Sequence, residues 1–323
     1  MEGSKTIIFG PVPSRRLGHS LGINNIPPKI CTYSCSYCQI GRTIKMQIER
    51  QIFYDKDYIL QAVKDKVNLT RKSGEMIDYL TFVPDGEPTL DINLGPEIDL
   101  LKPLGIPIAV ITNSSLIWQP DVRKDLMRAD WVSIKVDTVE DRIWRKIDRP
   151  HRKLDLDLIL EGALEFSRTF KGKLVIETML VVNINDADQH LTQVADFLSQ
   201  IQPDVVYLAI PTRPPAEKWV QAPDEHILNR AYHIFNDKVK HVEYLTGYEG
   251  GAFASTGNIE EDILSITAVH PMREDAVEVL LGRAGADWPV IHRMIENNQL
   301  TEATYGGHKF YLRRFKKQNK VEN

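Results

Sequence analysis

The chain has 323 residues, of which 42% are hydrophobic and 26% are charged. This length and composition exclude a disordered or collagen-like chain and suffice for one large domain or two smaller ones. The formal net charge of -4 excludes a basic field over the whole protein that would draw it onto nucleic acid. Because the sequence shows neither a secretory signal nor a run of about 18 apolar residues, we expect a cytoplasmic protein without membrane contact.

Apolar, β-branched segments alternate with segments of helical spacing along the first 236 residues. After an extended segment at 6–12, the expected strands are 20–26, 78–84, 107–113, 131–137, 173–182 and 204–210. The expected helices follow Cys38 and lie at 56–73, 119–128, 155–169, 187–201 and 223–236. Six such units predict an α/β domain over residues 1–250, either a partial (β/α)6 TIM-like barrel or a doubly wound sheet. Both folds place their chemistry at the carboxyl ends of the strands.

From about residue 258 the pattern changes to three amphipathic segments followed by two alternating strands around Gly306 and Gly307. We expect a small α+β domain over residues 258–316 that resembles a winged helix. Its basic residues gather only at its end, whereas its helices are acidic, so DNA binding is not favoured. A role in capping an active site or docking a partner protein fits this charge at least as well.

All three cysteines of the chain lie within eight residues, at Cys31, Cys35 and Cys38. An odd number of clustered thiols indicates a metal or metal-sulfur site rather than a disulfide framework. Zinc would need a fourth ligand from elsewhere in the chain. A 4Fe-4S cluster held by three cysteines would keep one iron open to a non-protein ligand, which points to chemistry rather than electron storage. We favour the cluster, with zinc as the alternative.

Polar residues follow the predicted strands and should share one edge of the sheet. Turns prefer such residues anyway, so any single one could be purely structural. Their combination with three cysteines makes the edge a candidate site. Its members are Gly86, Glu87 and Pro88 after the second strand, Asn113 and Ser114 after the third, Asp137 after the fourth, Asn183 after the fifth and Arg213 after the sixth.

The spacing Cys31-x3-Cys35-x2-Cys38, with Tyr37 before the last cysteine, resembles the signature of the radical S-adenosylmethionine (radical SAM) superfamily. The similarity spans roughly residues 18 to 215. It implies that the cysteines hold a 4Fe-4S cluster and that the segment Gly86 to Pro88 takes the place of a Gly-Gly-Glu motif that receives the methionine amino group. The further positions that it implies near the cofactor are Asn113, Ser114, Asp137 and Asn183.

The resemblance also implies the reaction: an electron from the cluster cleaves S-adenosylmethionine to a 5'-deoxyadenosyl radical. A reducing partner such as flavodoxin or ferredoxin would supply that electron. Two positions depart from the pattern, since Asp85 replaces a glycine and Lys135 stands where many members carry serine. Lys135 could pair with the cofactor carboxylate or with Glu177 on the neighbouring strand, and the sequence leaves both open.

Within the superfamily, GPVPSRRLGHSLGIN before the cysteines and PTRPP after the sixth strand look most like the branch related to wyosine synthases. The chain lacks the cysteines for a second cluster that those enzymes carry. Arg15, Arg16 and Arg213 could bind an anionic substrate such as a nucleotide or RNA. The rival hypothesis is a regulator whose redox-sensitive cluster switches a DNA-binding winged helix.

Overall fold

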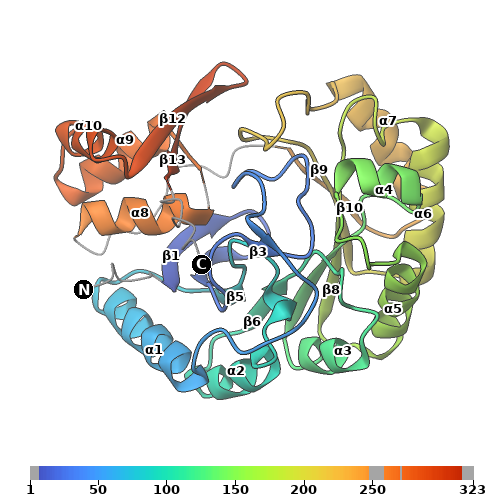
Figure 1. Ribbon diagram of the computed structural model, residues 1–323, viewed down its shortest axis with the longest axis horizontal. Helices are drawn as coiled ribbons and strands as arrows, with labels where there is room; N and C mark the ends of the chain where they lie inside the picture. The colour runs from blue at the N-terminus through green and yellow to red at the C-terminus, as the bar shows by residue number, and fades with distance from the viewer. Residues whose placement is uncertain (1–6, 247–257, 270, 315–323) are drawn as a thin grey trace, which may run out of the picture.

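A computed structural model describes residues 7–246, 258–269 and 271–314, with a mixed eight-stranded sheet at its centre (Figure 1). The strand order is β1-β2-β5-β6-β7-β8-β9-β10. β1 and β2 are antiparallel, and the other neighbours are parallel. The strands are β1 (Ile8–Ser14), β2 (Gly18–Ile23), β5 (Tyr79–Phe82), β6 (Ile108–Ile111), β7 (Trp131–Lys135), β8 (Lys173–Met179), β9 (Val205–Ala209) and β10 (Val242–Leu245).

Helices form a layer outside this sheet (Figure 1). They are α1 (Lys56–Lys72), α2 (Leu94–Leu101), α3 (Pro120–Leu126), α4 (Asp141–Ile147), α5 (Leu156–Thr169), α6 (Asp188–Ile201) and α7 (Glu225–Asn236), with short 3-10 turns η1 (Pro88–Leu90) and η2 (Lys102–Leu104). The predicted α/β class and partial barrel are confirmed, and each of the six predicted strands is present. Among the described residues, no helix combines the length and apolarity needed to cross a membrane.

Local sequence explains where these elements begin and what they bury. The side chain of Asp55 accepts hydrogen bonds from the backbone N–H groups of Asp57 and Tyr58, which caps α1. The helix then buries Ile59 and Val63 along one face, at the four-residue spacing that an amphipathic helix requires. Strands in the middle of the sheet carry apolar residues on both faces because helices cover one face and the barrel interior the other.

The prediction of a helix directly after Cys38 is wrong. Turns follow Cys38 instead, and the chain then forms the short strand β4 (Lys45–Met46), which pairs with β3 (Ile30–Cys31). Gly41 adopts a φ of 85°, which interrupts helical geometry, and the hydroxyl of Thr43 donates to the carbonyl of Tyr33 at 2.6 Å. The backbone here is satisfied by neighbouring loops rather than by a helix. Helices α2 and α4 and strand β10 were not predicted.

The turn between β1 and β2 enters the base of the barrel. Leu17 is 2% exposed and packs in an interior cluster with Ala109, Trp131, Val175 and Val205 from successive strands. This packing fills the amino-terminal end of the barrel. The same turn carries Arg15 and Arg16, which line the cavity above it.

The C-terminal elements are α8 (Ile259–Val269), β11 (Met272–Arg273), α9 (Glu274–Ala284), α10 (Pro289–Glu296), β12 (Leu300–Tyr305) and β13 (His308–Arg313). The three helices and the hairpin lie where the sequence predicts them, and β11 adds a third strand in the order β11-β13-β12. Their core includes Phe9 and Val12 of β1. The winged-helix assignment and the boundaries 1–250 and 258–316 stay predictions; residues 1–6, 247–250 and 315–316 lie outside the described residues.

Candidate functional site

The cysteine loop is attached to the strand ends by backbone contacts. Ile30, just before the first cysteine, forms a β-bridge with Gly86 and accepts a hydrogen bond from the Glu87 N–H at 3.2 Å. A Cβ atom at Gly86 would lie 1.9 Å from the Ile30 carbonyl oxygen. Only glycine therefore allows the loop to approach the end of β5 this closely. This close approach explains structurally why glycine stands at position 86.

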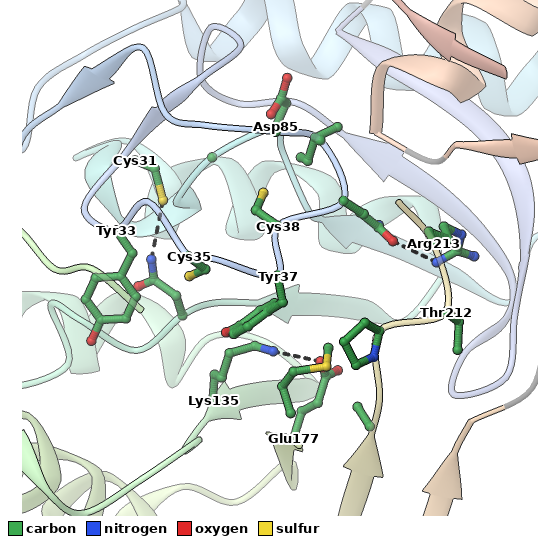
Figure 2. A pocket seen from close by; sticks show the side chains of 18 of the residues that line it. Cys31, Tyr33, Cys35, Tyr37, Cys38, Asp85, Lys135, Glu177, Thr212 and Arg213 are labelled. Carbon is green, nitrogen blue, oxygen red and sulfur yellow. Dashed lines mark hydrogen bonds and ion pairs between the residues drawn. The ribbon is translucent and has the colours of Figure 1, made fainter. Parts of the chain in front are cut away.

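A cavity of about 280 Å³ opens beside this loop (Figure 2). Several of the predicted site residues line it together, although they come from distant parts of the chain. They are Cys31, Cys35, Cys38, Tyr37, Gly86, Asn113, Lys135 and Arg213. The carboxyl ends of the parallel strands and the loop after β9 bring them to one place, as the topology of a partial barrel requires.

The three thiols form a donor set of one kind. Burial raises the pKa of the Cys31 thiol to about 12, and it also raises the pKa of Cys35 and Cys38. Within the described ranges, no group of three or more Cys, His, Asp or Glu side chains could hold a metal ion. Three cysteine thiols around one cavity are the type of donor that an iron-sulfur cluster takes from a protein.

Lys135 pairs with Glu177, one of the two partners that the sequence leaves open. The Lys135 Nζ lies 2.8 Å from Glu177 Oε1, and Arg16 pairs with the other oxygen of the same carboxylate. Burial favours the neutral acid, but Lys135 and Arg16 outweigh it and lower the pKa of Glu177 to about 2. The Lys135 ammonium also lies 4.8 Å from the centre of the Tyr37 ring. Figure 2 shows this pair beside the cysteine loop.

Asp137 lies behind Tyr37 rather than on the cavity wall. Its carboxylate accepts from the Tyr37 hydroxyl and, at 2.7 Å, from the Met179 N–H. The same hydroxyl lies 3.0 Å from Asp148 Oδ1, a residue that the sequence did not single out. Burial and the neighbouring Asp137 raise the pKa of Asp148 well above its usual range. Asp137 is thus placed to orient Tyr37.

Glu87, Pro88 and Ser114 do not line the cavity in the structure. Glu87 is fully buried, and its carboxylate accepts from the Thr89 hydroxyl, the Thr112 hydroxyl and the Asn113 N–H at 2.6 to 2.8 Å. Ser114 donates to the Lys135 carbonyl at 2.8 Å. These residues tie the end of β5 to the ends of β6 and β7, and thereby fix the wall from which Asn113 projects.

Asn183 lies in an exposed turn with a φ of 60° and is absent from the cavity lining, so its predicted cofactor contact stays a prediction. The buried asparagine is Asn185, two residues later. Its Nδ2 donates to the carbonyls of Asp137 and Met179 at 2.9 and 2.8 Å, which joins β7 to β8. The sequence segment contains both asparagines without a signal that separates them.

Further polar residues of the cavity were missed, among them Lys29 and Gln39. Lys29 lies 3.5 Å from Asp85, and both side chains are buried. Burial raises the pKa of Asp85 to about 6, although Lys29 and Arg313 oppose this rise. Gln39 directly follows Cys38 and accepts a hydrogen bond from the buried Arg213 at 2.8 Å. Proximity to Cys38 in the sequence was the signal that could have identified Gln39.

Comparison with known proteins agrees with this geometry. The family model described as Radical SAM superfamily matches residues 25–198. The UPF0026 protein MJ1312 of Methanocaldococcus jannaschii is 46% identical over 98% of both chains. A protein of Brachyspira hyodysenteriae named GTPase Obg is 32% identical over 93% of this chain, which spans only 44% of that longer protein.

Among solved structures, one of TYW1 with a lysine-pyruvate adduct bound superposes with a TM-score of 0.53. It covers 68% of this chain and 74% of that chain at 14% identity, so it shows a shared fold. Membership of the matched family implies S-adenosylmethionine and an iron-sulfur cluster as cofactors. The chain belongs to the radical SAM superfamily and is an enzyme of that superfamily.

Proposed function

We propose that this enzyme holds a 4Fe-4S cluster through Cys31, Cys35 and Cys38 and cleaves S-adenosylmethionine reductively to modify an anionic, nucleotide-like or RNA-like substrate. The observation that carries the proposal is the convergence of three half-buried cysteines on one cavity, beside polar groups from four strand ends. The clustered free thiols also favour a reducing compartment, so we propose that the enzyme works in the cytoplasm.

When bound, the reduced cluster and S-adenosylmethionine together supply a 5'-deoxyadenosyl radical that can remove hydrogen from an unactivated carbon. The chain's own residues would bind the cluster, orient S-adenosylmethionine and shield the cavity from water. The cysteines would hold three irons, and Asn113, Lys135 and Arg213 would offer an amide and two cations to the polar groups of S-adenosylmethionine. Ile40, Met179 and Ile210 line the same cavity and exclude water from it.

The charge of the cavity supports an anionic substrate. Apart from the thiolates that would hold the cluster, five cationic side chains line it against two carboxylates. The cations are Arg15, Arg16, Lys29, Lys135 and Arg213, and the carboxylates are Asp85 and Glu177. Arginine side chains match phosphate oxygens in geometry, which favours a nucleotide or RNA over a neutral substrate.

We propose a flavodoxin or ferredoxin as the reducing partner, because the three cysteines suffice for one cluster and leave none for a second. DNA binding by the C-terminal elements is not favoured. Lys309 lies within 3.7 Å of Glu274 and Glu302, and Arg293 pairs with Glu260. These ion pairs neutralise basic residues whose charge a DNA-binding regulator would need for phosphate contacts. Specific, salt-dependent DNA binding that changes with the state of the cluster would support the regulator instead.

Anaerobic reconstitution tests the proposal. With dithionite and S-adenosylmethionine, the wild-type protein should release 5'-deoxyadenosine, and the electron paramagnetic resonance signal of its reduced cluster should shift when S-adenosylmethionine is added. Cys35→Ala should abolish the product. Ser36→Ala is the matched control in the same loop, because the Ser36 hydroxyl is buried and has no hydrogen-bond partner among the described residues. A cluster signal that ignores S-adenosylmethionine, or copurifying zinc without iron, would contradict the proposal.

A further inference from the structure

The C-terminal hairpin reaches the rim of the cavity. The hydroxyl of Tyr305, at the end of β12, donates to the carbonyl of Pro211 at 3.1 Å, although the two residues are 94 positions apart. Pro211 lies two residues after the end of β9 and lines the cavity. The hairpin formed by β12 and β13 therefore contacts the barrel at the edge where the candidate site lies (Figure 1).

A chain of contacts leads from this point to the cysteine loop. Two residues after Pro211, Arg213 is 7% exposed, and its guanidinium donates to Gln39, the neighbour of Cys38. Further along the same segment, the Glu217 N–H donates to the carbonyl of Ser36 at 3.0 Å. Residues 211–217 are thus held between the cysteine loop on one side and the hairpin on the other. Figure 2 shows Arg213 of this segment pointing toward the cysteine loop.

The C-terminal elements also contact the opposite wall. Val83, at the end of β5, packs against their core, and the charge of Arg313 on β13 acts on the Asp85 carboxylate. β5 and β9 are separated by three strands in the sheet. The C-terminal elements touch the loops after both β5 and β9 and therefore span the mouth of the open barrel. Strand pairing alone does not fix the distance between these two loops.

We infer that the C-terminal hairpin is part of the frame of the active site, and that Tyr305 is a positioning residue that holds residues 211–213 so that Arg213 stays against Gln39 beside Cys38. This inference deepens the proposed function, on which its kinetic part rests. It gives the C-terminal elements a role in the barrel's own chemistry. Tyr305 itself acts through the backbone of Pro211 and does not line the cavity.

Tyr305→Phe removes only the hydroxyl and keeps the ring. The loss of one hydrogen bond is worth about a fivefold change in an equilibrium. In reconstituted protein we expect the iron content to stay at the wild-type value and the KM for S-adenosylmethionine to rise about fivefold, with kcat changed less. Amide exchange at 212–217 should accelerate by a similar factor. Tyr58→Phe is the matched control, because Tyr58 is 53% exposed on α1, outside the sheet.

A double-mutant cycle tests the route of the effect. In an Arg213→Ala background, Tyr305→Phe should raise KM by less than twofold, because the group that it positions is already missing. Additive effects would overturn the route through Arg213, and unchanged KM and exchange in Tyr305→Phe would overturn the positioning role. If the wild-type protein formed no cluster, the proposed function would fail instead, and amide exchange without a cluster would still decide whether Tyr305 holds residues 211–217.

Discussion

Two glutamates that are largely shielded from solvent, in different regions, have opposite protonation behaviour. Glu177 faces the cavity between Lys135 and Arg16, and these cations lower its pKa to about 2 against the effect of burial. Glu97 lies on α2 outside the sheet and is 1% exposed; among the described residues neither of its carboxyl oxygens has a hydrogen-bond partner. Burial, assisted by Asp91, raises the pKa of Glu97 to about 9.

The difference shows that burial does not decide the charge of a carboxyl group by itself. A partner of opposite charge keeps Glu177 ionised inside the barrel, whereas Glu97 retains a proton. Glu87 is an intermediate case with neutral donors only: burial raises its pKa although several hydrogen bonds oppose the rise. The barrel interior therefore offers cations to Glu177, whereas burial and the Asp91 carboxylate act on the pKa of Glu97.

The largest effect should come from removing a cation beside Glu177. Lys135→Met leaves that carboxylate with Arg16 as its remaining ion-pair partner, and breaking a buried pair costs about 3–5 kcal/mol. Urea unfolding of the cluster-free protein at neutral pH measures this loss. Lys45→Met, at an exposed position on β4, should change stability by less than about 0.5 kcal/mol.

Combining Lys135→Met with Glu177→Gln should recover part of the loss, because the buried charge is then removed as well. A destabilisation below about 1 kcal/mol in Lys135→Met would show that Arg16 alone suffices, and the distinction between the two regions would then rest on one cation.

A smaller effect should appear in the pH dependence of stability. The folded-state pKa of Glu97 is raised from 4.5 to about 9, so the folded protein binds the proton more tightly than the unfolded chain. Its contribution is complete below about pH 4.5 and is lost as pH rises toward 9, by at most about 1.4 kcal/mol per pH unit. Glu97→Gln should remove this slope between pH 6 and 8.

Urea unfolding at pH 6, 7 and 8 tests the slope, which a constant offset from the new amide does not alter. Glu278→Gln is the control, since Glu278 is exposed on α9 and should keep the wild-type slope. Parallel pH profiles for Glu97→Gln and the wild-type protein would mean that Glu97 is ionised in the folded state despite its burial.

The smallest effect should come from removing one hydrogen bond to Glu87, the glutamate with neutral donors only. Thr112→Val removes a 2.6 Å hydrogen bond to Glu87 and an acceptor for the Ser114 N–H. We expect a loss of about 1–2 kcal/mol in urea unfolding, with Thr304→Val on the exposed face of β12 as the control. Unchanged stability would show that the other donors to Glu87 satisfy it fully.

The sequence predicts the barrel well because apolar strands covered on both faces have a distinctive composition. Strand β7, with Val132 and Ile134 fully buried, is an example. The prediction of a helix after Cys38 is wrong because Gly41 has a positive φ and the Thr43 hydroxyl bonds to the Tyr33 carbonyl, which together form turns. The sequence does not show that Thr43 has this partner ten residues earlier. β10 (Val242–Leu245) was missed because Glu243 and the exposed Tyr244 interrupt its apolar run, whereas β5 and β6, of the same length, are nearly continuous in buried residues.

The candidate site was predicted where a residue type is itself diagnostic. The three cysteines, Asn113 and Arg213 line the cavity, as expected from their places after strands. Asn183 and Asn185 show the limit, since either could follow β8 and only the backbone path buries the second. Tyr305 could not be found at all, because its contact with Pro211 depends on how two distant parts of the chain pack.

The position of β1 has a consequence for how the molecule melts. Phe9 and Val12 are 2% and 8% exposed in the core shared with α8, α9 and α10, while β1 is also hydrogen-bonded to β2 of the main sheet. The C-terminal elements therefore cannot unfold without exposing apolar surface of the barrel's first strand. We expect calorimetry to record one cooperative transition, and two resolved peaks would contradict this. A single transition would mean that the change of sequence pattern near residue 258 is not a boundary between two independently unfolding units.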